Sequence, residues 1–277
     1  MELKELITEL RSKTGAGMMD CKKALEESKG SLDGAVTFLR KKGLADAAKR
    51  AARATKEGVV AFASEGGAGG LVELNSETDF VARTPEFVAL GQALAVKTAK
   101  GEMTGAAVAA PLIEPLQAKL KENMGLRRFE RYAPSGPALV AGYIHHGAKK
   151  GAMIELSVPS EAAAKDPAVA ELARELLLQI VGFSAKYLDK ASVPEADVAR
   201  EREIFAEVVR KDGKPEAAVP KIVEGKLNKL FFQAHCLLEQ MSVRDNKTPV
   251  AGLLKETGAK VGGEVKVARF VRYTLGE

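Results

Sequence analysis

The residues of this 277-residue chain that could act as nucleophiles or metal ligands are few and scattered. Its two cysteines, Cys21 and Cys236, lie far apart and match neither a C-x-x-C motif nor a metal-binding spacing. We predict that both thiols are small buried apolar groups in a reducing compartment, with a disulfide as the alternative. No G-x-x-x-x-G-K-[ST] motif is present. A hydrolase using Cys21 or His146 is a further hypothesis, and the lack of a nucleophile–base constellation argues against it. We therefore expect no catalytic residue, cofactor or metal site.

A carboxylate beside an aromatic ring, Asp79-Phe80, is the pair best suited to binding. It lies in a predicted loop between a strand and a helix that starts at Thr84-Pro85, with Thr as N-cap and Pro at the first helical position. A loop on a rigid scaffold can present such side chains to a partner. Composition and spacing alone favour the alternative, in which Phe80 belongs to the core and Asp79 caps a helix.

The first 54 residues are expected to form a small helical domain with a linker. Apolar residues at helical spacing begin at Leu3, and the paired glycines Gly15 and Gly17 favour a break. A second helix follows, and Ser31 is a plausible N-cap for a third. Residues 45–55 are rich in Ala, Lys and Arg, and we predict a helical linker with a basic face.

Two similar stretches follow, which predict a duplicated core. The first has a strand at 59–63, a turn at 65–70, a returning strand at 71–74 and then the helix from Pro85. The same pattern recurs 82 residues later and aligns without gaps from Gly69 and Gly151 onward. We predict a first core subdomain over 55–138 and a second over 139–277, each an antiparallel sheet with helices on one face. The alternative is a chance likeness between two αβ units.

Residues from about 193 to 233 predict an inserted helical hairpin. Two amphipathic helices flank the turn at 212–215. The predicted inner face of the second helix carries Val219, Ile222, Val223, Leu227 and Leu230. Because the hairpin interrupts the second unit, we expect it to project as an antiparallel coiled-coil arm. A final strand is predicted over 265–273. The fold class is therefore α+β.

The overall charge and the chain start predict a cytoplasmic protein. Met1 is not followed by a basic region and an apolar stretch, and no segment reaches the roughly 18 apolar residues of a membrane span. The net charge of +5 permits nucleic-acid binding without requiring it. The alternative to a solvated mixed-charge surface is a nucleic-acid-binding protein that uses Lys49, Arg50 and Arg53.

Two longer motifs carry a family resemblance. Residues 10–25 (LRSKTGAGMMDCKKAL) and 73–83 (ELNSETDFVAR) resemble, in the same order, the two signatures of the elongation factor Ts family. The resemblance implies a three-helix domain similar to a ubiquitin-associated domain, a core of two related subdomains and a coiled-coil insertion. It also implies a guanine-nucleotide exchange factor that binds elongation factor Tu in its GDP form and nucleotide-free form and speeds GDP release without a chemical step of its own.

The resemblance also assigns roles to individual residues. Thr78, Asp79, Phe80 and Val81 match the segment that intrudes near the Mg²⁺ site of the GTPase, with the Phe wedged between partner side chains. Arg11, Met18 and Met19 match residues that dock on a helix of the GTPase, although we expect one of these methionines to face the small domain's own core. His146 and Gly147, at the turn of the second hairpin, match a partner-contacting position, with a surface histidine as the alternative.

The resemblance bears on assembly as well. It implies a homodimer within a 2:2 complex with the GTPase, no direct contact with nucleic acid and no membrane association.

Overall fold

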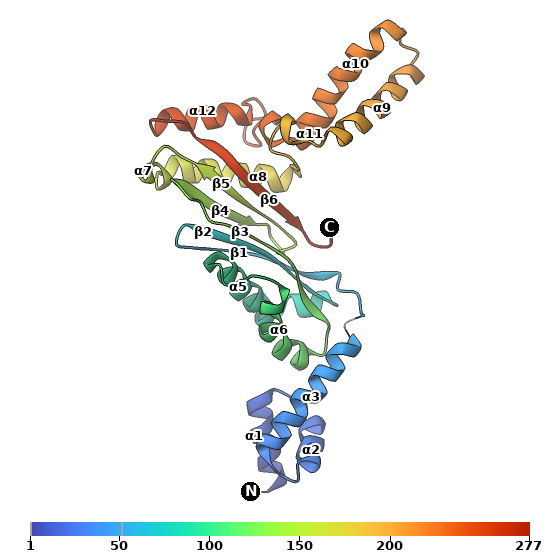
Figure 1. The fold of residues 1–277 in the computed structure, drawn as a ribbon, viewed down its shortest axis with the longest axis vertical. Coiled ribbons are helices and arrows are strands. Elements are labelled where there is room, and N and C mark those ends of the chain that lie inside the picture. The colour runs from blue at the N-terminus through green and yellow to red at the C-terminus, as the bar shows by residue number, and fades with distance from the viewer. Residues whose placement is uncertain (1, 51) are drawn as a thin grey trace.

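A computed structural model describes residues 2–50 and 52–277 of the chain, with the backbone only for residues 44–50. Helices and two small antiparallel sheets make up the fold, which confirms the predicted α+β class. The three-helix domain and a helical arm lie at opposite ends of the long axis, with the sheets between them (Figure 1). Within the described residues no helix combines the length and apolar character needed to cross a membrane.

The N-terminal domain consists of helices α1 (Leu3–Thr14), α2 (Met18–Glu27) and α3 (Leu32–Arg50). Gly15 ends α1 in the left-handed conformation (φ +67°), which glycine adopts without the steric penalty of a side chain. Leu10, Cys21 and Leu25 are buried where the helices meet. The third helix continues through Arg50, so most of the predicted linker is part of α3.

The first core unit begins with a tight hairpin. Glu65 and Ala68 pair across a two-residue turn, Gly66-Gly67, and both glycines have positive φ angles, as a type I′ turn requires. The turn is thus shorter than the predicted 65–70, because the second strand resumes at Ala68. The unit contains β1 (Glu57–Glu65), β2 (Ala68–Ser76), α4 (Asp79–Ala82), α5 (Pro85–Lys100), α6 (Ala106–Leu120) and β3 (Met124–Tyr132).

We did not predict α6 or β3. Pro111 and Pro115 lie inside α6, and proline normally disfavours a helix interior because it lacks the N–H donor and its ring clashes with the preceding turn. Ala109, Ile113 and Gln117 nevertheless bury one side of α6 against the unit, while both prolines are exposed. The apolar face therefore outweighs the unfavourable helix propensity.

The second core unit repeats the first around a long insertion. Its elements are β4 (Ala138–Ile144), β5 (Lys150–Ser157), α7 (Glu161–Ala164), α8 (Pro167–Gly182), α12 (Val250–Lys260) and β6 (Lys266–Thr274). The sheet orders β1-β2-β3 and β4-β5-β6 correspond, and each central strand has a register shift at the same place, after Glu73 and after Glu155. The offset between equivalent residues is 82 from Glu73 to Glu155 and 141 from Arg128 to Arg269, so the insertion lies between α8 and α12.

The insertion holds a projecting helical hairpin (Figure 1). It comprises α9 (Glu195–Lys211), α10 (Val219–Lys226), a π-helical turn (Leu227–Phe232) and α11 (Gln233–His235), with 3₁₀ turns at Lys190–Ser192, Glu216–Ala218 and Leu237–Glu239. The π-helical turn shifts the phase of the buried face, so Phe231 and Phe232 are buried whereas Leu230 is 52% exposed. The prediction that Leu230 faces inward was therefore wrong.

The two sheets pack face to face and the helices cover their outer sides. Helices α5 and α6 cover the first sheet, and α8 and α12 cover the second (Figure 1). Leu71, Met153, Tyr132 and Tyr273 lie in the apolar cluster between the sheets. The protein body is thus a four-layer sandwich in which the sheets form the two inner layers.

Two arginines, each paired with a buried glutamate of its own sheet, connect the two sheets in a reciprocal way. Arg128 pairs with Glu73 of its own sheet (2.7 Å) and stacks on Tyr273 of the other sheet, 4.2 Å from the ring centroid. Arg269 pairs with Glu155 (2.8 Å) and stacks on Tyr132, at 4.1 Å. Burial raises the pKa of Tyr273 to about 12 and also raises that of Tyr132, so both rings stay neutral.

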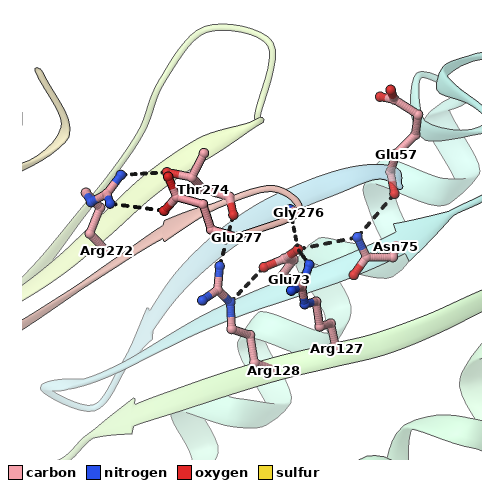
Figure 2. A network of polar contacts seen from close by, with 9 residues as sticks. All are labelled: Glu57, Glu73, Asn75, Arg127, Arg128, Arg272, Thr274, Gly276 and Glu277. Carbon is pink, nitrogen blue, oxygen red and sulfur yellow. Dashed lines mark hydrogen bonds and ion pairs between the residues drawn. The ribbon is translucent and has the colours of Figure 1, made fainter. Parts of the chain in front are cut away.

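Glu73 also holds the end of the chain. Figure 2 shows the Glu73 carboxylate between Arg127, Arg128 and Gly276. The backbone N–H of Gly276 donates to Glu73 Oε1 at 3.1 Å. The Arg128 guanidinium donates to the carbonyl of Thr274 at 3.0 Å. The C-terminal segment is thereby fastened to the first sheet.

Candidate functional site

The segment predicted as a loop after β2 is a one-turn helix, α4. Thr78 has an extended backbone and acts as N-cap, because its hydroxyl oxygen accepts from the backbone N–H of Val81 at 3.4 Å. The Ser76 hydroxyl donates to the carbonyl of Thr78 at 3.0 Å. The sequence pattern was too short to distinguish a single helical turn from a loop.

The turn of α4 separates its side chains into two sets. Val81 and Ala82 are 8% and 6% exposed and pack in the core between the first sheet and its helices. Phe80 is 82% exposed. The interpretation of Phe80 as a core residue is therefore wrong, and Val81, which we grouped with the partner-facing residues, anchors the helix from inside.

Asp79 lies next to Phe80 in a weak ion pair. Its carboxylate is 2.8 Å from the guanidinium of Arg83, and the two side chains are 38% and 77% exposed. An exposed pair at this spacing on a helix contributes only about 0.3–0.5 kcal/mol. A competing cation or hydrogen-bond donor can therefore take over the Asp79 carboxylate at little cost.

The loop between α6 and β3 holds the start of α4, and sequence reasoning missed it. Both carboxylate oxygens of Glu122 accept from Thr78, from its N–H at 3.1 Å and from its hydroxyl at 2.5 Å. The neighbouring Asn123 donates its N–H to the Glu77 carboxylate at 2.6 Å. Glu122 is 44 residues from Thr78 in the chain, so no local pattern could have identified the contact.

The predicted docking residues of the small domain form a separate exposed group. Met18 and Met19, in the first turn of α2, are 58% and 73% exposed, and Arg11 on α1 is exposed. The expectation that one methionine faces inward was wrong, since Leu10, Cys21 and Leu25 fill that small core. Two adjacent flexible thioether side chains therefore face solvent.

His146 and Gly147 lie at the tip of the β4–β5 hairpin, where both are exposed. The hairpin tip contacts the first unit: Val60 N–H donates to the carbonyl of Ala148 at 2.7 Å, and Lys149 pairs with Glu57 at 2.8 Å. Glu57 in turn pairs with Ser76, at the end of the strand that leads to α4. The structure thus brings His146 and Gly147 to the end of the body that carries Asp79 and Phe80.

The cysteines and Arg53, on which the alternative predictions depend, are buried or ion-paired. Cys21 and Cys236 are free and fully buried, and burial raises the pKa of both thiols, that of Cys236 to about 11. Among the described residues no group of three His, Cys, Asp or Glu side chains could hold a metal ion. Arg53 pairs with Glu77 at 3.4 Å, and the side chains of Lys49 and Arg50 fall outside the described residues.

Comparisons with known proteins agree with one another. The family model described as elongation factor TS matches residues 77–277. The elongation factor Ts of Nitratidesulfovibrio vulgaris (strain DP4) is 44% identical over 275 residues, covering 98% of this chain and 95% of that protein. The elongation factor Ts of Symbiobacterium thermophilum is 46% identical, covering 99% of this chain and 91% of that protein. That of Prosthecochloris aestuarii is 40% identical, with coverage of 98% and 97%.

Proposed function

The chain belongs to the elongation factor Ts family, and from that premise we propose that it is a cytoplasmic guanine-nucleotide exchange factor of translation elongation. It binds elongation factor Tu in the GDP form, disturbs the Mg²⁺ and phosphate site and promotes GDP release, so that GTP can bind. Its action is binding alone, with no chemical step of its own. The contact is made by Asp79 and Phe80, on the N-capped α4.

The exposure of Phe80 is the observation that carries this proposal. An aromatic ring that is 82% exposed on a folded helix gains little from its own protein, but it offers a large apolar area to a partner. Inserted aromatic rings are among the side chains that contribute most to binding at protein interfaces. The buried Val81 and Ala82 resist displacement of the helix when the ring is pushed into a partner.

Asp79 supplies the electrostatic part of the mechanism. GDP is held by a GTPase largely through its phosphates and the associated Mg²⁺, whose ligands are oxygen atoms and water. A carboxylate brought beside that site competes for the groups that order the ion. Because Asp79 is held only by an exposed ion pair with Arg83, it is free to make this contact.

Thermodynamic reciprocity then gives exchange. If the factor binds nucleotide-free elongation factor Tu more tightly than the GDP form, its binding weakens GDP by the same ratio. We propose that the small domain, of ubiquitin-associated type, holds the GTPase through Arg11, Met18 and Met19, while His146 and Gly147 make a further contact beside α4. Attachment at separate places lets α4 be pressed in while the partner stays bound. The helical hairpin is proposed to be a coiled-coil arm.

The test is stopped-flow release of a fluorescent GDP from elongation factor Tu, with and without this protein. We expect the wild type to accelerate release and Phe80→Ala to accelerate it far less. Phe183→Ala is the matched control, because Phe183 is also exposed (53%) but follows α8 in the second unit. Equal rates for Phe80→Ala and the wild type would show that another surface drives exchange.

A further inference from the structure

The three-residue loop Lys121-Glu122-Asn123 contacts several segments that are distant in sequence. Lys121 ends α6 in the left-handed conformation (φ +58°), which is uncommon for a residue other than glycine. Its backbone N–H closes the helix on the carbonyl of Gln117 at 2.9 Å. This sharp ending directs Glu122 and Asn123 toward the segment that precedes α4.

Glu122 grips the N-cap residue of α4 at two points. Its two carboxylate oxygens accept separately from the N–H and the hydroxyl of Thr78. Hydrogen bonds to an ionised acceptor are roughly twice as strong as neutral ones, and two of them on one residue fix orientation as well as position. The same Thr78 hydroxyl oxygen caps α4, so Glu122 contacts the group that forms the N-cap of the helix.

The residues on either side of Glu122 reach the small domain and the chain that joins it to the core. Asn123 donates its side-chain amide to the carbonyl of Arg53 at 2.9 Å, just before β1. Lys121 pairs with Asp20 at 3.1 Å, and Asp20 directly follows Met19. The loop therefore touches both the segment bearing the exposed methionines and the segment bearing Phe80.

We propose that the loop 121–123 is the positioning element of the exchange site. Glu122 is a positioning residue that sets the direction of Phe80 and Asp79 through Thr78. A one-turn helix has little stability of its own, so its geometry depends on such anchors. A ring held in its binding direction loses less freedom on docking. The role in exchange rests on the function proposed above, whereas the effect on α4 itself does not.

The absence of tryptophan from the sequence permits a direct test of α4 in the isolated protein. Phe80→Trp gives a full-length chain with a single tryptophan, whose fluorescence anisotropy reports the mobility of α4. Adding Glu122→Gln keeps the size of the side chain and removes one of the two acceptors, so we expect lower anisotropy. Glu161→Gln, on the equivalent helix α7, is the matched control and should leave it unchanged. Unchanged anisotropy for Glu122→Gln would overturn the positioning role.

A pair of changes at Thr78 gives a second arm. Thr78→Val removes the hydroxyl and should lower the anisotropy as Glu122→Gln does. Thr78→Ser keeps the hydroxyl and should restore the wild-type value. An equal effect of Val and Ser would show that the hydroxyl contact to Glu122 is not what holds α4.

Exchange kinetics test the functional part with elongation factor Tu. We expect Glu122→Gln to lower the maximal rate of GDP release about tenfold, with a smaller change in the half-saturating concentration, because the other contacts remain. In the Asp79→Ala Phe80→Ala background, the same substitution should cause no further loss. A full additive loss would mean that Glu122 acts by another route, since residues in one chain of contacts are non-additive.

The two proposals fail in different ways. If the wild type accelerates release and Glu122→Gln matches it, the positioning role is wrong and the exchange function stands. If the wild type does not accelerate release, the exchange function is wrong, and the anisotropy of the isolated protein still decides whether Glu122 holds α4.

Discussion

The two core units share one scaffold, but only the first carries an exposed aromatic helix. Thr78 and Ser160 are equivalent, and each caps a one-turn helix, by accepting from Val81 N–H at 3.4 Å and from Ala163 N–H at 3.2 Å. The next positions differ: Asp79-Phe80 in the first unit corresponds to Glu161-Ala162 in the second. The capped turn is therefore a structural feature of both units, and the aromatic ring belongs to the first unit alone.

The support behind the two helices differs as well. Glu122 of the first unit corresponds to Gly263 of the second, where an added Cβ would lie 2.6 Å from Pro159. In the second unit the loop at Gly263 therefore packs directly against Pro159. In the first unit the equivalent loop holds α4 through the Glu122 carboxylate. The first unit carries the exposed Phe80, and the second carries the helical insertion. The two units can differ in this way because each sheet supports its own core.

The largest expected effect concerns the two buried glutamates. Glu73→Ala should lower the free energy of unfolding by about 3 kcal/mol, because it removes a fully buried carboxylate and leaves the buried Asn75 amide and the Gly276 N–H without their acceptor. Glu155→Ala should cost less, since Glu155 has one arginine partner whereas Glu73 has two arginines and the Gly276 N–H. Urea unfolding measures both, with the exposed Glu65→Ala as control. Equal losses for Glu73→Ala and Glu155→Ala would break the proposed asymmetry.

The next effect concerns exchange itself. The Asp79→Ala Phe80→Ala variant should slow stimulated GDP release about 30-fold, the loss of about 2 kcal/mol typical of a binding hot spot. Glu161→Ala, at the equivalent place in the second unit, should leave the rate unchanged. Adding Ala162→Phe to the double variant should not restore exchange. Stopped-flow measurement decides this, and restoration would mean that either helix can serve.

A third effect tests the close packing of the second unit. Gly263→Ala should destabilise the protein by about 1–3 kcal/mol, because its Cβ would overlap Pro159. The control is Gly125→Ala in the first unit, where an added Cβ meets no atom within 4 Å. Thermal unfolding compares the two variants, and similar midpoints would refute the packing difference.

The smallest expected effect separates the caps. Thr78→Ala and Ser160→Ala should each cost about 1 kcal/mol of stability through the lost cap. Only Thr78→Ala should also slow exchange, because it removes the hydroxyl contact between α4 and Glu122. Unfolding and GDP-release measurements on both variants test this, and slower exchange in Ser160→Ala would contradict it.

The parts of the fold that sequence predicts are those governed by local rules. The hairpins, the helices beginning at Pro85 and Pro167, and the final strand follow from turn residues, caps and alternation. Helix α6 was missed because Pro111 and Pro115 contradict helix propensity, and tertiary packing outweighs them. Leu230 was misplaced because a π-helical turn changes the period of the helix.

The candidate site likewise contains residues that the sequence identifies and residues that only the fold reveals. Asp79 and Phe80 stand out through their motif, but their exposure depends on which side of a single turn each falls. Val81, adjacent in sequence, lies inside. Glu122 is invisible to local patterns because its role arises only when the fold brings α6 beside the end of β2.

The contact between Glu73 and Gly276 has a consequence for folding, because it spans 203 residues of chain. Contacts between residues so far apart in the chain carry a large loop-closure entropy and slow folding. Arg127 and Arg128 of the first unit already pair with the Glu73 charge, and the Gly276 N–H adds a neutral donor once β6 has docked. The segment that follows β6 thus joins the second unit to the first sheet through contacts of the longest sequence separation.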